Sequence, residues 1–107
     1  MRFILVLLIT SFGATAMAQN NCDKWSHRPQ YIEAIKAVAQ AEKYEFAELC
    51  SLPEVLDIEA QPSHTVTRDG EVIPHVQIQL HMNTKSCLYM VRNADLAITS
   101  QRCYSGW

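Results

Sequence analysis

Apolar residues recur at helical spacing in the segment from residue 29 to residue 50. From Pro29 to Cys50 the segment has no glycine and carries good helix formers. One face of a helix would collect these apolar side chains: Ile32, Ile35, Ala39, Phe46 and Leu49. Pro29 suits a first helical turn, and Pro53 ends the segment because the residue before a proline avoids helical geometry. The pattern predicts one helix of about five turns over residues 29–50.

After Pro53 the period of the apolar positions changes to two, which is typical of half-buried strands. In residues 55–60, Leu56, Ile58 and Ala60 alternate with the positions between them. Residues 72–82 alternate more cleanly, and two further strand segments follow at 86–93 and 96–104. One helix followed by such strands predicts an α+β fold, with the N-terminal helix packed on a four- to five-stranded antiparallel meander.

The first eighteen residues have the pattern of a secretory signal peptide. Arg2 precedes an apolar run over residues 3–10, and Ala16-Met17-Ala18 is the small-x-small pattern that signal peptidase reads. The run is too short for a permanent membrane span, so an uncleaved anchor is the weaker alternative. We expect cleavage after Ala18, leaving residues 19–107 as one small periplasmic or secreted domain without a stable membrane anchor.

Charge and composition exclude several classes of function. The chain has 9 basic and 11 acidic residues, and loss of Arg2 with the leader leaves 8 basic residues and a net charge of −3. This balance offers no electrostatic basis for binding nucleic acid or an anionic membrane. The glycines, at 13, 70 and 106, form no phosphate-binding loop. We expect no cofactor and no catalytic residues, with a small hydrolase as a remote alternative.

Four cysteines lie beyond the leader and predict two disulfides, with three possible connectivities. No C-x-x-C spacing occurs, which argues against a zinc site built from them. If the last hairpin turns about Asp95, Cys87 faces Cys103, which leaves Cys22 for Cys50. A straight helix of about 30 Å between Cys22 and Cys50 opposes that second bridge. The crossed pairings therefore remain open, although the local pairing is favoured.

The Asp69-Gly70 pair is a strong signal for a two-residue hairpin turn of type I′. In the register that such a turn imposes, Arg68 meets Glu71 and His64 meets His75. Two adjacent imidazoles could hold copper or zinc if a third ligand joined them. That register places no carboxylate or third histidine beside them. A metal site at His64 and His75 is therefore the alternative, and exposed polar strand residues are the main expectation.

We expect the sheet face turned away from the helix to be a mixed polar and apolar contact surface. Val66, Ile73 and Tyr89 are expected to add apolar area to it. The residues expected to contact a partner protein are on this face or at the hairpin tip: Val66, Arg68, Asp69, Ile73, His75, Gln77, Gln79 and His81. A signal peptide, two bridges and an open face together indicate an exported, non-enzymatic inhibitor or immunity protein that binds another exported protein.

The order of one long helix followed by a disulfide-linked antiparallel meander resembles the cystatin-like group of folds and small exported PepSY-type inhibitory domains. The resemblance is architectural and covers most of residues 19–107. The glycine-containing inhibitory loop of cystatins is absent from this chain. Two other functions fit the same features: a periplasmic copper- or zinc-binding protein that uses His64 and His75, and a stabilising subunit of an envelope complex.

Overall fold

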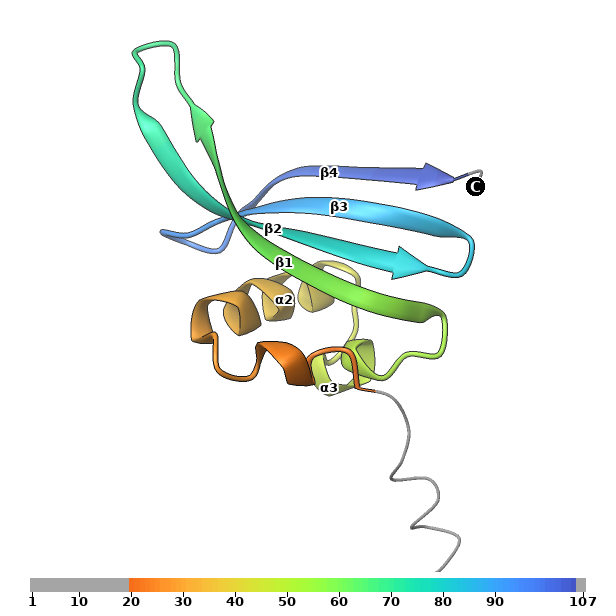
Figure 1. Ribbon diagram of the computed structural model, residues 1–107. Coiled ribbons are helices and arrows are strands. Elements are labelled where there is room, and N and C mark those ends of the chain that lie inside the picture. The colour runs from red at the N-terminus through yellow and green to blue at the C-terminus, as the bar shows by residue number, and fades with distance from the viewer. Residues whose placement is uncertain (1–19, 106–107) are drawn as a thin grey trace, which may run out of the picture.

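The computed structural model describes residues 20–105, and the expected signal peptide lies outside the described residues. The fold is α+β, with a helical layer on one face of an antiparallel meander in the order β1-β2-β3-β4 (Figure 1). The predicted meander is confirmed, with four strands. The elements are a 3₁₀ turn and two helices, η1 (Asp23–Trp25), α2 (Pro29–Ala41) and α3 (Phe46–Cys50), and the strands β1 (Val55–Val66), β2 (Val72–Met82), β3 (Lys85–Arg92) and β4 (Ile98–Ser105).

The single helix expected over residues 29–50 is wrong, because the chain forms two helices with a break between them. Lys43 has a φ of 67°, in the left-handed region. The N–H of Tyr44 donates to the carbonyl of Ala39 at 2.9 Å, which is a hydrogen bond of the Schellman helix end. Glu45 then caps α3. Apolar periodicity missed this break because no glycine marks the left-handed position.

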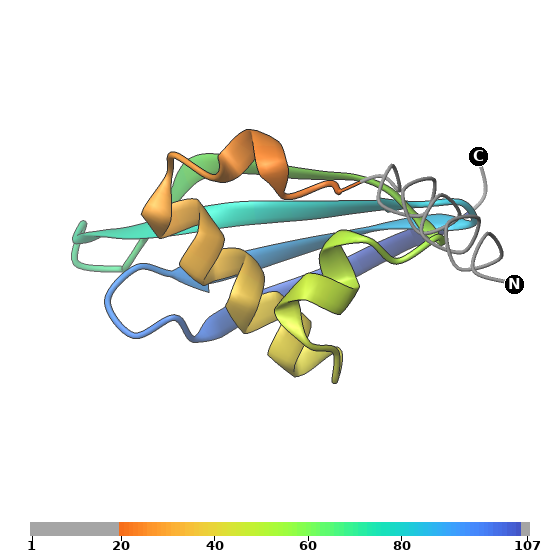
Figure 2. The ribbon, with the colours of Figure 1, turned by 90° about the horizontal axis from the view of Figure 1, so that it is seen from below.

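The break decides the first disulfide. α2 alone is about 20 Å long, and α3 leaves it at an angle on the same face of the sheet (Figure 2). Cys50 therefore reaches Cys22, and the two are bridged with their Cα atoms 5.3 Å apart. Cys87 is bridged to Cys103. The favoured pairing is confirmed, and each bridge is expected to stabilise the fold by about 3 kcal/mol through loop closure.

The β3–β4 hairpin has the predicted register in its outer part. Cys87 lies opposite Cys103, as the expected turn about Asp95 requires. A bulge near the turn then places Val91 opposite Ile98 rather than opposite the expected Thr99. Arg92 and Asp95 hold the turn with two hydrogen bonds of 2.9 Å, and this guanidinium lowers the pKa of Asp95 to about 2.

The β1–β2 hairpin differs from the expected type I′ turn. Thr67 N–H donates to the carbonyl of Glu71 at 2.9 Å, and Gly70 N–H donates to the carbonyl of Thr67 at 3.0 Å. Gly70 has a φ of 86°. These are the marks of a three-residue loop, Arg68 to Gly70, that ends in a left-handed glycine. The strand register is therefore shifted by one residue from the expected one, and Arg68 does not pair with Glu71.

The hydrophobic core lies between the helical layer and one face of the sheet. A bulge in β1 turns both Val55 and Ile58 inward and leaves Leu56 52% exposed, so the expected inward position of Leu56 is wrong. The expected inward positions of Ile58 and Ala60 are confirmed, because both residues are buried. The largest fully buried side chains come from both layers: Ile35, Val38, Leu49, Val55, Ile58, Ile78, Leu80, Tyr89 and Val91.

Tyr89 joins the two layers at the end of α2. The expectation that it adds apolar area to the outer sheet face is wrong, since it is buried in the core. Its hydroxyl donates to the carboxylate of Glu42 at 2.8 Å, and the side-chain amide of Gln101 donates to the same oxygen at 3.3 Å. Burial raises the pKa of Tyr89 well above its ordinary value, and the hydrogen bond and charge of Glu42 raise it further.

Replacing Tyr89 with phenylalanine should therefore lower the free energy of unfolding by about 1–2 kcal/mol, because it removes a hydrogen bond to a charged group. Urea unfolding measures this change. Tyr104→Phe is the matched control, since Tyr104 is 53% exposed, and it should alter stability by less than about 0.5 kcal/mol. Equal effects of the two substitutions would contradict a role for the Tyr89–Glu42 bond.

The raised pKa of Tyr89 also predicts a loss of stability in alkali. The unfolded chain releases the phenolic proton near the ordinary pKa of about 10, while the folded chain retains it. Stability from this group is thus complete below that pH and declines above it. From about pH 9 to about pH 11, the urea midpoint should fall more steeply in the parent protein than in Tyr89→Phe.

The hairpin loop makes a separate prediction. Gly70→Ala should destabilise the protein by about 1 kcal/mol, because its φ of 86° is strained for alanine although space is open around it. Asp69 has no positive φ, so Asp69→Ala should cost less than about 0.5 kcal/mol. A type I′ turn needs positive φ at both positions, so comparable losses in thermal unfolding would favour that turn instead.

Candidate functional site

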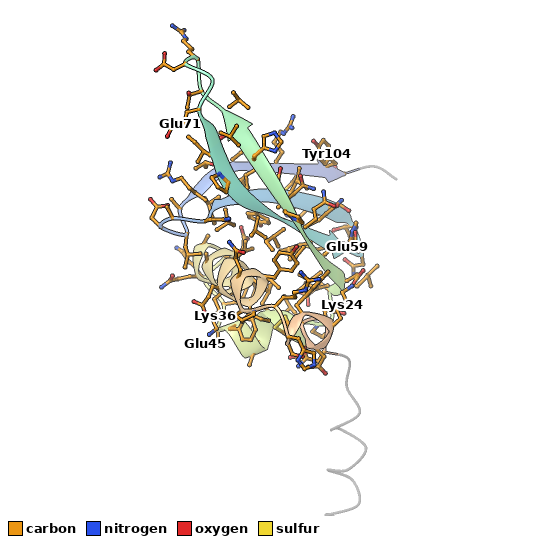
Figure 3. The ribbon with its side chains drawn as sticks, turned by 60° about the vertical axis from the view of Figure 1, so that its left-hand side comes forward. Lys24, Lys36, Glu45, Glu59, Glu71 and Tyr104 are labelled. Atoms are coloured by element: carbon orange, nitrogen blue, oxygen red, sulfur yellow. A yellow bond between two sulfur atoms is a disulfide. The ribbon has the colours of Figure 1, made fainter. Side chains whose placement is uncertain are left out.

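One face of the sheet carries no helix among the described residues, since α2, α3 and η1 all lie on the other side (Figure 1). We call this surface the open face. The strand registers place side chains from all four strands on it in rows: Glu59, Gln61, Gln77, Gln79, His81, Ser86, Leu88, Met90, Ser100, Arg102 and Tyr104. Figure 3 shows Tyr104 on the side of the sheet opposite Lys36 and Glu45 of the helical layer.

Leu88 and Met90 form the apolar centre of the open face. They are half-buried on β3, where Gln79 and Gln77 lie opposite them on β2. On the other side, Arg102 of β4 lies opposite Leu88. An apolar centre with a polar surround is the usual anatomy of a protein contact surface.

Sequence reasoning missed Leu88 and Met90 because it assigned the wrong face of β3 to solvent. Both faces of β3 carry apolar side chains, so the period of the apolar residues alone does not show which face is buried. A signal was present in the polar residues at the strand's ends. Ser86 and Arg92 share the face of Leu88 and Met90, and polar residues favour the solvent side.

The expected contact residues divide between the two faces of the sheet. Ile73, Gln77, Gln79 and His81 lie on the open face and are partly exposed. Val66 does not lie on the open face. Its side chain is on the same face of the sheet as the helices, but it lies near the hairpin end, where no helix covers it, and it is 58% exposed. The one-residue register shift moves Val66 to that side.

Arg68 and Asp69 lie at the exposed end of the β1–β2 hairpin, which projects beyond the rest of the sheet (Figures 1 and 3). Val66 and Val72 face each other just below this end, 58% and 60% exposed. The projecting hairpin therefore presents a small apolar pair beneath a charged tip.

His75 is a buried residue and not the exposed contact residue that was expected. It is 3% exposed. One ring nitrogen lies 2.9 Å from the carbonyl oxygen of Ile73 and the other lies 2.9 Å from the hydroxyl of Thr99. These contacts hold β2 against the start of β4, so His75 has a structural role on the open face.

The expected meeting of His64 and His75 is also wrong. His64 lies opposite Pro74, and His75 lies opposite Ser63, so the two imidazoles point to opposite faces of the hairpin. Residues 20–105 contain no cluster of three histidine, cysteine or acidic side chains that could hold a metal ion. The paired-histidine metal site therefore loses its geometric basis.

His81 joins a chain of hydrogen bonds that the sequence did not reveal. One of its ring nitrogens lies 2.9 Å from a carboxylate oxygen of Glu59, and the other lies 3.3 Å from the hydroxyl of Ser86. A serine, a histidine and a carboxylate in line can activate a nucleophile. Here Ser86 lies within a strand, where backbone N–H groups point along the sheet and not toward a substrate above it. These hydrogen bonds orient the three polar side chains on the open face.

A groove of about 370 Å³ lies beside the base of the projecting hairpin, on the helical side. Its lining includes Arg28 and Tyr31 from the start of α2, Pro62 and Val76 from the sheet, and Asn93. The side-chain oxygen of Asn93 is buried and has no hydrogen-bond partner within the described residues. Because that oxygen is enclosed by protein atoms, it is not offered to a ligand in the groove.

Comparison of the chain with known protein families, with curated proteins and with solved structures gave no match. Within residues 20–105, none of the helices has the length and apolar character needed to cross a membrane. The two disulfides fit a protein that works in the periplasm or outside the cell. The open face is therefore interpreted from its own geometry.

Proposed function

We propose that this protein is an exported, non-enzymatic module that binds another exported protein through the open face, as an inhibitor or immunity protein. The observation that carries the proposal is the uncovered sheet face with Leu88 and Met90 at its centre. Half-buried apolar side chains on a rigid sheet lose water when a partner covers them, which favours association.

The polar side chains around this centre support recognition of a protein surface. Gln61, Gln77 and Gln79 form a ladder across β1 and β2, and each amide can both donate and accept hydrogen bonds. The charges are separated, with Glu59 on β1 and Arg102 on β4. A partner with complementary charges would bind in one orientation.

The rigidity of the sheet also supports this function. The Cys87–Cys103 bridge links β3 to β4 on the face that the helices cover, and His75 fixes β2 against β4 through Thr99. A surface that is already ordered gives up little conformational entropy on binding.

The architecture of the domain also supports the proposed function. A helix laid across an antiparallel meander resembles the arrangement of cystatin-like folds and PepSY-type inhibitory domains, in which a small exported domain acts on another protein. The projecting hairpin, with Arg68 and Asp69 at its tip, would add a second contact beside the open face.

Affinity capture tests the proposal, with the disulfide-bonded protein as bait and the exported fraction of its source as sample. We expect a stoichiometric protein partner whose dissociation constant rises at least about tenfold in Gln79→Arg and in Leu88→Lys, because both changes lie in the open face. Isothermal titration with the purified partner measures this change.

Gln40→Arg is the matched control, since Gln40 is exposed on α2 in the helical layer, and it should leave the affinity unchanged. Thermal unfolding of each variant shows whether the fold is retained. Failure to capture a partner, or a partner that binds Gln79→Arg and Leu88→Lys as tightly as the parent, would exclude the open face as the binding surface.

A further inference from the structure

The two edges of the sheet are protected to different degrees, and the β1 edge is the protected one. Trp25 donates its indole N–H to the outward carbonyl of Ile58 at 2.9 Å, and the N–H of Ile58 donates to the carboxylate of Asp57 at 2.9 Å. Further along the same edge, Pro62 has no N–H to offer. Another strand therefore cannot pair along the middle of β1.

The β4 edge has no such protection among the described residues. In the β3–β4 ladder, Cys87 and Cys103 form a close pair with Cα atoms 4.0 Å apart, which marks a pair without mutual backbone hydrogen bonds. Such residues point their N–H and C=O groups away from the neighbouring strand. By alternation, Gln101, Cys103 and Ser105 all present these groups to solvent, and β4 contains neither proline nor an acidic residue.

We propose that β4 pairs in antiparallel fashion with β4 of a second copy of this chain, about a two-fold axis at Cys103. Two outward-facing residues must meet for the strands to exchange hydrogen bonds, which allows an axis from Gln101 to Ser105. An axis at Tyr104 or Ser105 would leave Gln101 without a partner residue in β4 of the other copy. An axis at Arg102 would place two guanidinium groups opposite each other. An axis at Gln101 would use Thr99, where the ladder is interrupted by the bulge near Val91.

The axis at Cys103 satisfies both requirements. Gln101 then meets Ser105 of the other copy, so all three outward-facing positions on each strand form hydrogen bonds. On the open face, Arg102 lies opposite Tyr104 of the other copy, and a guanidinium beside an aromatic ring is attractive. Tyr104 is 53% exposed in the single chain and is available for this contact.

The proposed pairing joins the two sheets into one of eight strands, with both helical layers on the same side. α2 packs on β2 and β3 and crosses the sheet obliquely, so that only its C-terminal end, at Glu42, reaches β4 through Gln101 (Figure 2). The two open faces become continuous across the axis. The pairing itself rests on the β4 edge, so it does not depend on whether the open face binds another protein.

Sedimentation equilibrium of the disulfide-bonded protein, from about 10 µM to about 1 mM, tests the proposal in the range expected for a small interface. We expect a monomer–dimer equilibrium. Gln101→Pro removes an outward N–H from each strand and should raise the dissociation constant at least about tenfold. Gln101→Ala retains that N–H, and it should change the constant less than about threefold while also losing the side-chain bond to Glu42.

His64→Pro places the same substitution at an outward position of the opposite edge and should leave the dimer unchanged. Thermal unfolding identifies any variant that fails to fold, in which case Ser105→Pro replaces Gln101→Pro. A protein that is monomeric at about 1 mM would overturn the proposal and leave the edge to a strand of another protein. A dimer that persists in Gln101→Pro would overturn it as well.

The register has its own test. Tyr104→Arg places an arginine opposite Arg102 twice in each dimer and should weaken association about tenfold. The double variant Arg102→Glu/Tyr104→Arg restores two opposite-charge pairs and should return the dissociation constant to within about threefold of the parent value. A double variant as weak as Tyr104→Arg would exclude the axis at Cys103.

Discussion

The packing of α2 on one face of the sheet is the interaction on which the rest of the structure depends. It buries Ile35 and Val38 of the helix against Ile78 and Leu80 of the sheet, and it leaves the other face to solvent. Tyr89 secures the layer at the end of α2 through its hydrogen bond to Glu42. Because the helices within residues 20–105 all lie on one side of the sheet, the uncovered side is available for a partner.

Two local backbone features set the rest of the geometry. The left-handed Lys43 ends α2 early, which allows Cys50 to bond with Cys22. The left-handed Gly70 ends a three-residue loop, which sets the β1–β2 register and separates His64 from His75. A change of one residue in that loop would have exchanged the two faces of β1 relative to β2.

The open face and the β4 edge would act together. Tyr104 and Arg102 lie at their common border, so a second copy at the edge would extend the surface offered to a partner. The protected β1 edge, with Trp25 over Ile58, confines such growth to one side. Association would then stop at two copies and not continue into a fibre, since a two-fold pairing of β4 uses its free edge in both chains.

Sequence by itself determined the class of fold, the meander, the β3–β4 pairing at Cys87 and the solvent side of Gln77 and Gln79. These follow from period, from cysteine count and from polarity, which are local properties of the chain. The tertiary structure alone decided the helix break at Lys43, the hairpin register, the burial of His75 and the choice of Leu88 over Tyr89 for the open face. Each of these features depends on a backbone position with positive φ, on a one-residue shift in strand register, or on which face of the sheet the helices cover. None of these changes the spacing of apolar residues along the chain.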